Sequence, residues 1–436
     1  MDTPSSDTSG VTDEKDTDSL TPERLRDVET WPITRDVRQL DARLYPDGSR
    51  RGNLGVTWQD LTVKGVSNDA MFNENVLSQF NPFGKSGKSV PDKTIIESSS
   101  GCVKPGEMLL VLGRPGAGCT SLLSILANRR LGYSKVEGQV SFGSMSHKEA
   151  EQYRGQIVMN TEEEIFFPAL TVKDTIDFAT RLKVPHTLPS GVKDTSEYAQ
   201  INEDFFLKAM GIEHTKDTKV GDAYIRGVSG GERKRVSIVE CLATRGSVFC
   251  WDNSAMRAMT DVLGLTTIAT FYQAGNGIFE QFDKVLILDE GQQLFYGRRE
   301  DAVPFMEELG FYCDPAANKA DFLTGVTVAT ERTIIRGFEG RFPRSASEIR
   351  AAYELSTIKA NMLAEREYPL SLEAQENTAA FRKLVAAETD PRLPKRSVTS
   401  AGPFTQVKTV VVRQFQILWG DKATLFLKQG SATVQA

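Results

Sequence analysis

A glycine-rich segment, residues 113–121 (GRPGAGCTS), has the residue types and the spacing of a phosphate-binding loop. The apolar run 108–112 precedes it and the helical pattern 122–127 follows it, which predicts a turn between a strand and a helix. Glycines allow successive backbone N–H groups to curl around a phosphate at a helix N-terminus. We therefore predict that a nucleotide is bound by Gly113, Arg114, Pro115, Gly116, Ala117, Gly118, Cys119, Thr120 and Ser121.

The loop departs from the pattern G-x-x-x-x-G-K-[ST] at one position, where Cys119 replaces the lysine. The Thr120 hydroxyl remains available for Mg²⁺, but no lysine charge reaches the β- and γ-phosphates. We expect a loop that binds nucleotide and catalyses poorly. The alternative for this motif alone is a chance glycine turn in an α/β protein, and residues further along the chain argue against it.

Two later strand patterns end in polar residues that suit the same chemistry. Segment 247–253 (SVFCWDN) carries Asp252, at the position from which a carboxylate reaches Mg²⁺ in phosphate-loop enzymes. The next residue, Asn253, stands where a general base would act, and an amide cannot accept a proton near neutral pH. Tyr272 follows strand 265–271, where a histidine that senses the γ-phosphate is expected, and none of the three histidines lies near that strand. These residues predict a degenerate catalytic site.

A second glycine turn, within residues 228–238 (VSGGERKRVSI), opens another helical pattern. Ser229 stands at the position of a helix cap, and two backbone N–H groups with a hydroxyl at a positive helix end make an anion site. We predict that this second site consists of Ser229, Gly230, Gly231 and Glu232.

The other patterns predict an α/β fold around these sites. Strands are expected at 56–63 and 156–159, and a β-hairpin is expected at 285–297 around the turn Asp289-Glu290-Gly291. Thr171 caps a helix with Asp174 at its third position, and the chain is mostly helical from there to about residue 227. Residues 67–93 are expected to form a loop, whose segment 84–89 (GKSGKS) imitates a phosphate loop without a strand leading into it.

Composition narrows the class of protein. The 436 residues are 40% hydrophobic with a formal net charge of −6, which suits one sizeable globular domain with accessory segments and excludes a basic nucleic-acid-binding surface. The five cysteines show no C-x-x-C spacing and no signal peptide precedes them, so we expect reduced intracellular thiols. Residues 1–45 are rich in Ser, Thr and acidic residues, which predicts a disordered tail. No run of about 18 apolar residues occurs, so we do not expect the chain to span a membrane by itself.

Together, segments 113–121, 229–238, 250–254, 272–274 and 311–313 resemble the N-terminal nucleotide-binding half of fungal pleiotropic-drug-resistance ABC transporters, the full-length G subfamily. The resemblance runs from about residue 46 to the end of the chain. In that family the N-terminal half has Cys for the Walker A lysine, Asn for the Walker B glutamate, Tyr for the switch histidine and Glu in the Q-loop. This sequence has Cys119, Asn253, Tyr272 and Glu162 at those positions, together with an intact signature at 228–238.

The resemblance implies ATP and Mg²⁺ as ligands and an ABC-type P-loop NTPase fold. That fold has a RecA-like core, an antiparallel β subdomain and a helical insertion, here at about 171–227. It also implies two partners, a second nucleotide-binding half and transmembrane domains, with export of xenobiotics or lipids from the cytosolic face of a membrane. In such a pair one composite site hydrolyses ATP and the other mainly binds it.

Two departures from the family pattern matter. The D-loop that should follow Walker B is absent, because only residues 253–266 connect the two strands. Near the end of the chain, Phe404, Val407, Val411, Phe415 and Leu418 lie on one helical face, resembling the family's connecting helix at the membrane surface. The alternative for residues 404–419 is an ordinary amphipathic helix packed on the domain. The chain is expected to stop before the first membrane span.

These expectations divide the chain into a tail (1–45), a nucleotide-binding domain (46–335), a linker (336–400) and a connecting helix (401–436). The first functional hypothesis is an ATP-binding half of a drug-efflux transporter. A soluble nucleotide-binding regulator or scaffold, or a non-functional truncated product, is the alternative. A stand-alone ATPase is disfavoured by Cys119, Asn253 and Tyr272 together.

Overall fold

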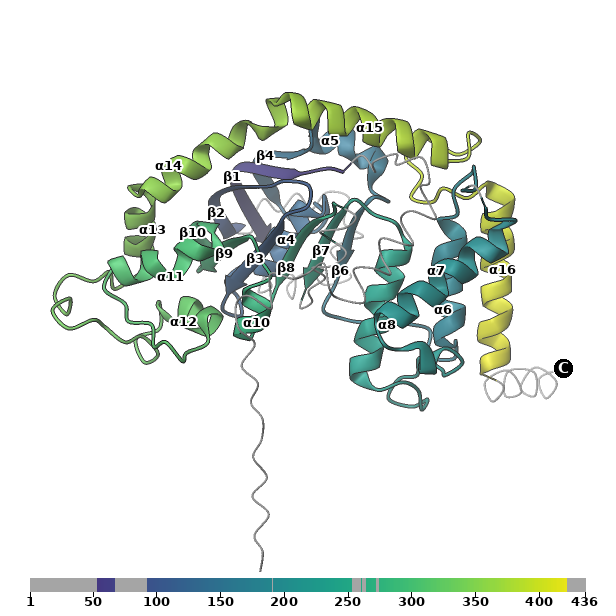
Figure 1. Ribbon diagram of the computed structural model, residues 1–436, viewed down its shortest axis with the longest axis horizontal. Coiled ribbons are helices and arrows are strands. Elements are labelled where there is room, and N and C mark those ends of the chain that lie inside the picture. The colour runs from purple at the N-terminus through teal and green to yellow at the C-terminus, as the bar shows by residue number, and fades with distance from the viewer. Residues whose placement is uncertain are drawn as a thin grey trace, which may run out of the picture.

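The computed structural model describes residues 53–66, 92–189, 191–252, 260, 264–271 and 274–421. Its strands form one sheet in the order β5-β4-β1-β2-β10-β9-β3-β8-β7-β6, with helices on both faces and at one side (Figure 1). The strands are β1 (Val56–Val66), β2 (Asp92–Val103), β3 (Met108–Gly113), β4 (Lys135–Phe142), β5 (Met145–Ser146), β6 (Ile157–Asn160), β7 (Val248–Asp252), β8 (Thr266–Thr270), β9 (Lys284–Asp289) and β10 (Gln292–Arg298).

The half of the sheet that contains β3 is parallel. Strand β3 pairs with β8 on one side and with β9 on the other, and β8 is followed by β7 and β6. Strands β7, β8 and β9 are buried at every position, as expected for parallel strands that are covered on both faces. The structure thus contains the predicted strands 108–112, 247–253 and 265–271 to within a residue or two at each end.

The predicted hairpin around residues 289–291 is confirmed by the antiparallel pairing of β9 with β10. Glu290 and Gly291 have φ angles of 48° and 76°, the left-handed conformation that tight hairpin turns require. The hairpin does not lie at an edge of the sheet. Strand β10 pairs at one position with β2 and so joins the parallel half to the antiparallel half.

The antiparallel half consists of β1, β2, β4 and β5. Strand β1 covers the predicted strand 56–63, whereas the sequence analysis did not predict β2. Strand β2 contains three serines and a glycine, which have low strand propensity. It forms because β1 pairs along it and because Ser99 Oγ accepts from Trp58 Nε1 (3.0 Å) and donates to Gln293 Oε1 (2.7 Å). Tertiary pairing overrides local preference here.

The helices position the two predicted sites. Helix α4 begins at Cys119, separated from the end of β3 by the five residues 114–118, and the predicted helical insertion contains α6 and α7 ahead of α8. Thr171 and Asp174 form the predicted capping arrangement of α6, and Ser229 and Glu232 form the same arrangement at α8. The α-helices are α4 (Cys119–Leu126), α5 (His147–Ala150), α6 (Val172–Leu182), α7 (Thr195–Ala209), α8 (Gly230–Ala243), α10 (Asn276–Phe279), α11 (Arg299–Glu308), α12 (Lys319–Gly325), α13 (Ala346–Glu354), α14 (Thr357–Leu363), α15 (Leu372–Glu388) and α16 (Pro403–Gly420). Short 3₁₀ helices are η3 (Glu151–Tyr153), η4 (Glu213–Thr215) and η5 (Ala364–Leu370).

The segment expected to be a linker, residues 336–400, is largely helical and packs on the sheet. Helices α13, α14 and α15 arch over the antiparallel half (Figure 1). The Tyr353 hydroxyl donates to the carbonyl of Tyr296 (2.6 Å), and the ring of Phe381 packs edge-on against Tyr153 at 5.1 Å. Helices α13 and α15 each have one buried face, which carries Tyr353 and Phe381 respectively, as expected for helices packed on a domain.

A buried ion cluster fastens this helical segment to the sheet. Lys284 on β9, whose side chain is 4% exposed, lies 2.7 Å from both Glu107 and Glu365, the latter in η5. Burial lowers the pKa of Lys284, but the two carboxylates outweigh this effect and hold the pKa above its usual value. The ammonium is therefore charged, and it bridges two segments that are far apart in the sequence.

Replacing this lysine in Lys284→Met should destabilise the chain by about 3 kcal/mol, because two half-buried carboxylates lose their counter-ion. The free energy of unfolding, measured by urea titration, checks this. The matched control is Lys135→Met, since Lys135 pairs with Glu137 on the surface and its loss should have no measurable effect. Equal free energies of unfolding for the two variants would contradict the conclusion that this ion cluster stabilises the packing of the helical segment on the sheet.

Several expectations fall outside the described residues: the tail 1–45, the imitation loop 84–89, Asn253, Tyr272 and most of the connection 253–266, in which no D-loop is expected. Among the residues that are described, no helix has the length and apolarity needed to cross a membrane.

Candidate functional site

The glycine-rich loop joins β3 to α4 and takes a conformation that its glycines permit. Gly116 and Gly118 have φ angles of 88° and 102°, and Gly118 is the residue that caps α4. A Cβ atom at Gly113 would lie 2.7 Å from both Cys119 Sγ and the Leu288 carbonyl oxygen. Each of these glycines is therefore required by backbone geometry or by a close contact, as in a loop that wraps an anion.

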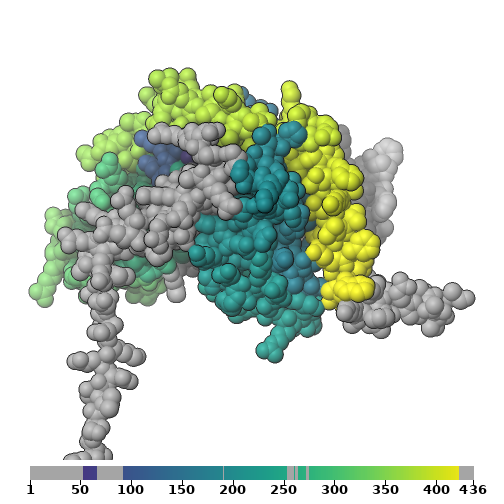
Figure 2. Space-filling model, turned by 45° about the vertical axis from the view of Figure 1, so that its right-hand side comes forward, coloured from purple at the N-terminus to yellow at the C-terminus, as the bar shows by residue number. Residues whose placement is uncertain are grey.

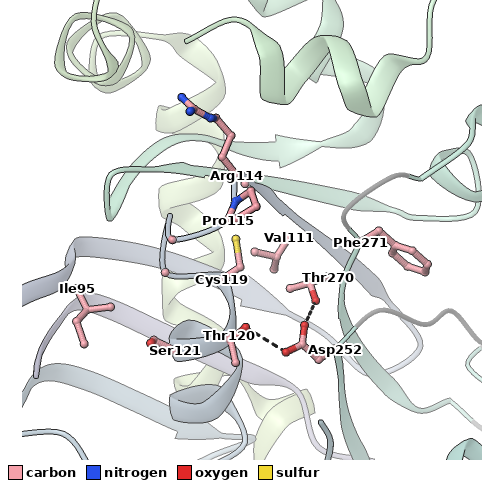
Figure 3. Close-up of a pocket in the computed structure, with 13 residues that line it drawn as sticks. Ile95, Val111, Arg114, Pro115, Cys119, Thr120, Ser121, Asp252, Thr270 and Phe271 are labelled. Atoms are coloured by element: carbon pink, nitrogen blue, oxygen red, sulfur yellow. Dashed lines mark hydrogen bonds between the residues drawn. The ribbon is translucent and has the colours of Figure 1, made fainter. Parts of the chain in front are cut away.

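Asp252 lies at the carboxyl end of β7 and faces the loop. Its Oδ2 accepts a hydrogen bond from the Thr120 hydroxyl (3.1 Å), and its Oδ1 accepts one from the Thr270 hydroxyl at the end of β8 (Figure 3). The two predicted Mg²⁺ ligands, Thr120 and Asp252, thus come together from distant parts of the chain. They meet because the carboxyl ends of parallel strands share one edge of the sheet.

A pocket of about 200 Å³ opens beside these residues. It is lined by Ile95, Val111, Gly113, Arg114, Pro115, Gly116, Gly118, Cys119, Thr120, Ser121, Asp252, Thr270 and Phe271. The Arg114 side chain extends away from Thr120 and Asp252 (Figure 3). Ala117 belongs to the loop but is buried beneath it.

Cys119 contributes no charge to this pocket. Burial raises the pKa of its thiol to about 12, and the neighbouring carboxylates of Asp252 and Asp289 act in the same direction. The thiol is therefore neutral at physiological pH, and it neither replaces the ammonium of a lysine nor acts as a nucleophilic thiolate.

The residues present fit a nucleotide phosphate with Mg²⁺. A hydroxyl and a carboxylate oxygen 3.1 Å apart are hard oxygen ligands of the kind that Mg²⁺ takes, and the loop leaves open space around Gly116. When bound, the metal ion would neutralise phosphate charge. Thr120 and Asp252 would hold it, and the backbone of the loop would hold the phosphates.

The second predicted site lies at the start of α8. The Ser229 backbone N–H and hydroxyl both donate to Glu232 Oε2 at 2.8 Å, which confirms the predicted cap. The hydrogen bonds from Ser229, with a further one from His214, lower the pKa of Glu232 to about 2. Gly230 and Gly231 are exposed, and a Cβ atom added to either would meet no other atom within 4 Å.

The structure brings together Gly113 to Ser121 with Asp252, and it places the predicted residues of the second site and Glu162 elsewhere. The pocket at Cys119 is not lined by Glu162 or by the residues of the second site, Ser229, Gly230, Gly231 and Glu232. Glu162 lies in the exposed stretch that follows β6.

Sequence reasoning missed two of the lining residues that matter. Thr270 is the last residue of β8, within the predicted strand 265–271. Its proximity to Asp252 could have been inferred, because the carboxyl ends of adjacent parallel strands lie side by side. Ile95 lies on β2, the strand that the sequence analysis did not predict, so no local pattern indicated it.

Helix α16 packs on α6 through its polar side. Gln416 Nε2 donates to Asp174 Oδ1 (2.6 Å), and the Arg413 guanidinium lies 3.9 Å from the ring centroid of Phe178. The apolar face predicted from the sequence points outward instead, with Phe404 and Phe415 exposed by 82% and 69%. Figure 2 shows the helix along the flank of the helical region. The helix does contact the domain, but not through the face that an ordinary amphipathic helix would bury.

Comparisons with known proteins agree with this architecture. The ABC transporter family profile matches residues 96–256. The chain is 56% identical over 426 residues to "ABC multidrug transporter H" of Aspergillus fumigatus, covering 94% of this chain and 30% of that protein. It is 58% identical over 408 residues to "ABC-type transporter cns4" of Cordyceps militaris, covering 90% and 30%.

More distant matches also exist. "ABC transporter G family member 21" of Dictyostelium discoideum is 38% identical over 412 residues, covering 89% of this chain and 28% of that protein. A solved dimer of an ATP-binding cassette bound to ADP and Pi aligns with a TM-score of 0.41 at 15% identity, over 56% of this chain and 98% of that chain. The chain spans about 30% of the length of the curated fungal relatives named above.

The resemblance predicted from the motifs is confirmed: residues 96–256 match the ABC transporter family, and about 90% of the chain is similar to part of fungal ABC multidrug transporters and of a G-family ABC transporter.

Proposed function

We propose that this chain is the ATP-binding part of a G-family ABC transporter, in the position of its N-terminal nucleotide-binding half, and that it takes part in the export of xenobiotics or lipids. The single observation that carries the nucleotide-binding part of this proposal is the hydrogen bond of Thr120 to Asp252 at the glycine-rich loop. The names of the relatives support the transport part.

In this proposal the loop binds Mg-ATP and the chain alone does not turn it over. The neutral thiol of Cys119 leaves the developing phosphate charge without a cation. Asn253, from the sequence, stands where a base would act. Binding is therefore supported by the backbone, Thr120 and Asp252, while the two usual contributors to the rate are missing.

The test is Mg²⁺-dependent binding of ATP to the whole chain. We expect Asp252→Asn to weaken Mg-ATP binding on the order of tenfold or more, because an amide is a poorer Mg²⁺ ligand and offers N–H where Thr120 donates. Calorimetric titration of the chain with ATP, once in the presence of Mg²⁺ and once with a chelator in its place, measures the affinity. The control is Asp321→Asn on the exposed surface of α12, which should bind as the unsubstituted chain does. No binding by the unsubstituted chain would refute the proposal.

We further propose that the Ser229 site serves a partner half. The signature residues do not line this chain's own pocket, and a helix N-terminus with exposed glycines suits a phosphate brought by another molecule. The partner would be a second nucleotide-binding half, with transmembrane domains attached. In this arrangement the chain contributes its glycine-rich loop to one composite site and its Ser229 site to the other.

The outward face of α16 is proposed to lie at the cytosolic surface of the membrane. Its exposed Phe404, Phe415 and Trp419 are large apolar side chains, and their burial in a lipid interface would be favourable. Sedimentation of the chain with anionic lipid vesicles tests this. Binding that is unchanged in Phe415→Glu would count against it.

A further inference from the structure

One lysine attaches the signature helix α8 to the strand ends of the nucleotide site. The ammonium of Lys234 lies 3.3 Å from the side-chain oxygen of Asn160, 3.3 Å from the carbonyl oxygen of Thr161 and 3.3 Å from the carbonyl oxygen of Asp252. Asn160 ends β6 and Asp252 ends β7, and these two strands are neighbours. A single side chain of α8 therefore contacts the ends of two core strands.

The orientation of Asn160 is set by the same helix. Its side-chain amide donates to Ser237 Oγ (2.7 Å) and to Cys241 Sγ (3.3 Å), which leaves its oxygen facing Lys234. Residues 234, 237 and 241 lie on one face of α8, because they are three and four positions apart. Asn160 is 3% exposed, so this polar contact between α8 and β6 is largely withdrawn from water.

Asp252 is held from both sides. Its carboxylate accepts from Thr120 of the glycine-rich loop and from Thr270, while its backbone carbonyl accepts from Lys234 (Figure 3 shows the carboxylate contacts). A displacement of the Asp252 backbone would also move the carbonyl oxygen that accepts from Lys234. The same residue thus connects the loop to the start of α8.

A second contact ties the same turn of α8 to the stretch after β6. Arg233 Nε donates to Glu164 Oε2 at 2.8 Å, two residues beyond Glu162. Arg233 and Lys234 are the fourth and fifth residues of α8, which begins with the exposed Gly230 and Gly231. The first turn of α8, which presents the signature, is therefore held by contacts to the ends of β6 and β7 and to the stretch after β6, in addition to the cap that Ser229 forms with Glu232.

We infer that Lys234 is a positioning residue: through its contacts, binding of nucleotide at the Cys119 loop changes the position of the signature at the start of α8. The inference rests on the proposed function, since it requires that the loop bind Mg-ATP. Through this lysine, occupation of the site within this chain would orient Ser229, Gly230 and Gly231 for the phosphate brought by a partner. The lysine itself touches no substrate.

Amide hydrogen exchange on the full chain, with and without Mg-ATP, tests the inference residue by residue. In the unsubstituted chain, Mg-ATP should slow exchange both in the loop 113–121 and in the first turn of α8, residues 230–235. In Lys234→Met the slowing at α8 should fall by about fivefold or more, while the slowing in the loop is retained. Lys234→Arg, which keeps a charged donor, should retain most of the effect at α8.

The matched control is Arg235→Met, one position further along the same helix. Arg235 is exposed and contacts the carbonyls of Gly231 and Met210 instead of the strand ends, so its loss should leave the ATP-dependent slowing unchanged. If Lys234→Met does not fold, Lys234→Gln, which keeps a shorter donor, replaces it and should show an intermediate loss.

The outcomes separate this inference from the proposed function. If Mg-ATP slows exchange in the loop, and slows it at α8 equally in Lys234→Met and in the unsubstituted chain, Lys234 does not have the proposed role. Nucleotide binding would then still stand. Slowing in the loop without any at α8 in the unsubstituted chain would overturn the role of Lys234 as well. No slowing in the loop would refute nucleotide binding, and this inference with it.

Discussion

Replacing Gly230 by aspartate is expected to abolish ATP hydrolysis by this chain when it is paired with a partner nucleotide-binding half. The substitution places a carboxylate at the helix N-terminus where the partner's γ-phosphate would sit, and two negative charges in a confined site repel. A Cβ atom at Gly230 would meet no atom of a neighbouring element within 4 Å, so the variant should fold normally. Steady-state phosphate release by the reconstituted pair measures the effect.

Three further substitutions make this result specific. Gly230→Ala adds a Cβ without charge and should lose less activity than Gly230→Asp. Ser229→Ala removes the hydroxyl that caps α8 and should also stop hydrolysis, whereas Cys119→Ala should leave most of it. The reverse order, with Cys119 essential and the signature dispensable, would refute the composite-site assignment. A failure of the unsubstituted pair to hydrolyse ATP would instead favour a non-functional truncated product.

Restoring a lysine in Cys119→Lys is expected to tighten Mg-ATP binding by about 10-fold to 100-fold. Charge-assisted hydrogen bonds are worth roughly 1.5–3 kcal/mol, and each 1.4 kcal/mol is tenfold in affinity. The Cys119 side chain lines the pocket, so a longer side chain starting at this position can extend into it. Hydrolysis by the chain alone should stay at background, because Asn253 still offers no base.

The control for this substitution is Cys119→Met, which adds length without charge and should not tighten binding. Titration calorimetry gives the affinities of both variants, and phosphate release gives their rates. Equal tightening in both variants would mean that packing, not charge, limits binding at this loop. Hydrolysis restored by the lysine alone would contradict the role assigned to Asn253.

Local patterns were sufficient wherever neighbouring residues carry the structure. The loop 113–121 lies between β3 and α4 as its glycines and flanking apolar residues predict, and Ser229 caps α8 as its spacing from Glu232 predicts. Turn conformations and helix caps depend on residues within a few positions of one another, so a sequence displays them directly. The family resemblance rested on these same local segments, and the comparisons confirmed it.

Pairing between distant segments was decided only by the tertiary structure. Strand β2 exists despite its serines because β1 pairs along it and Gln293 accepts from Ser99, and segment 336–400 is held to the sheet by Lys284 and Glu365. Thr270 reaches Asp252 because two strand ends meet, and Lys234 reaches the same residue because α8 packs beside β6. The outward direction of the apolar face of α16 follows from the contact of Gln416 with Asp174, which lies more than two hundred residues earlier in the chain. The sequence by itself therefore predicted which residues would carry the nucleotide chemistry. The tertiary structure decided which of them act together, because the free energy of packing depends on contacts that no local pattern records.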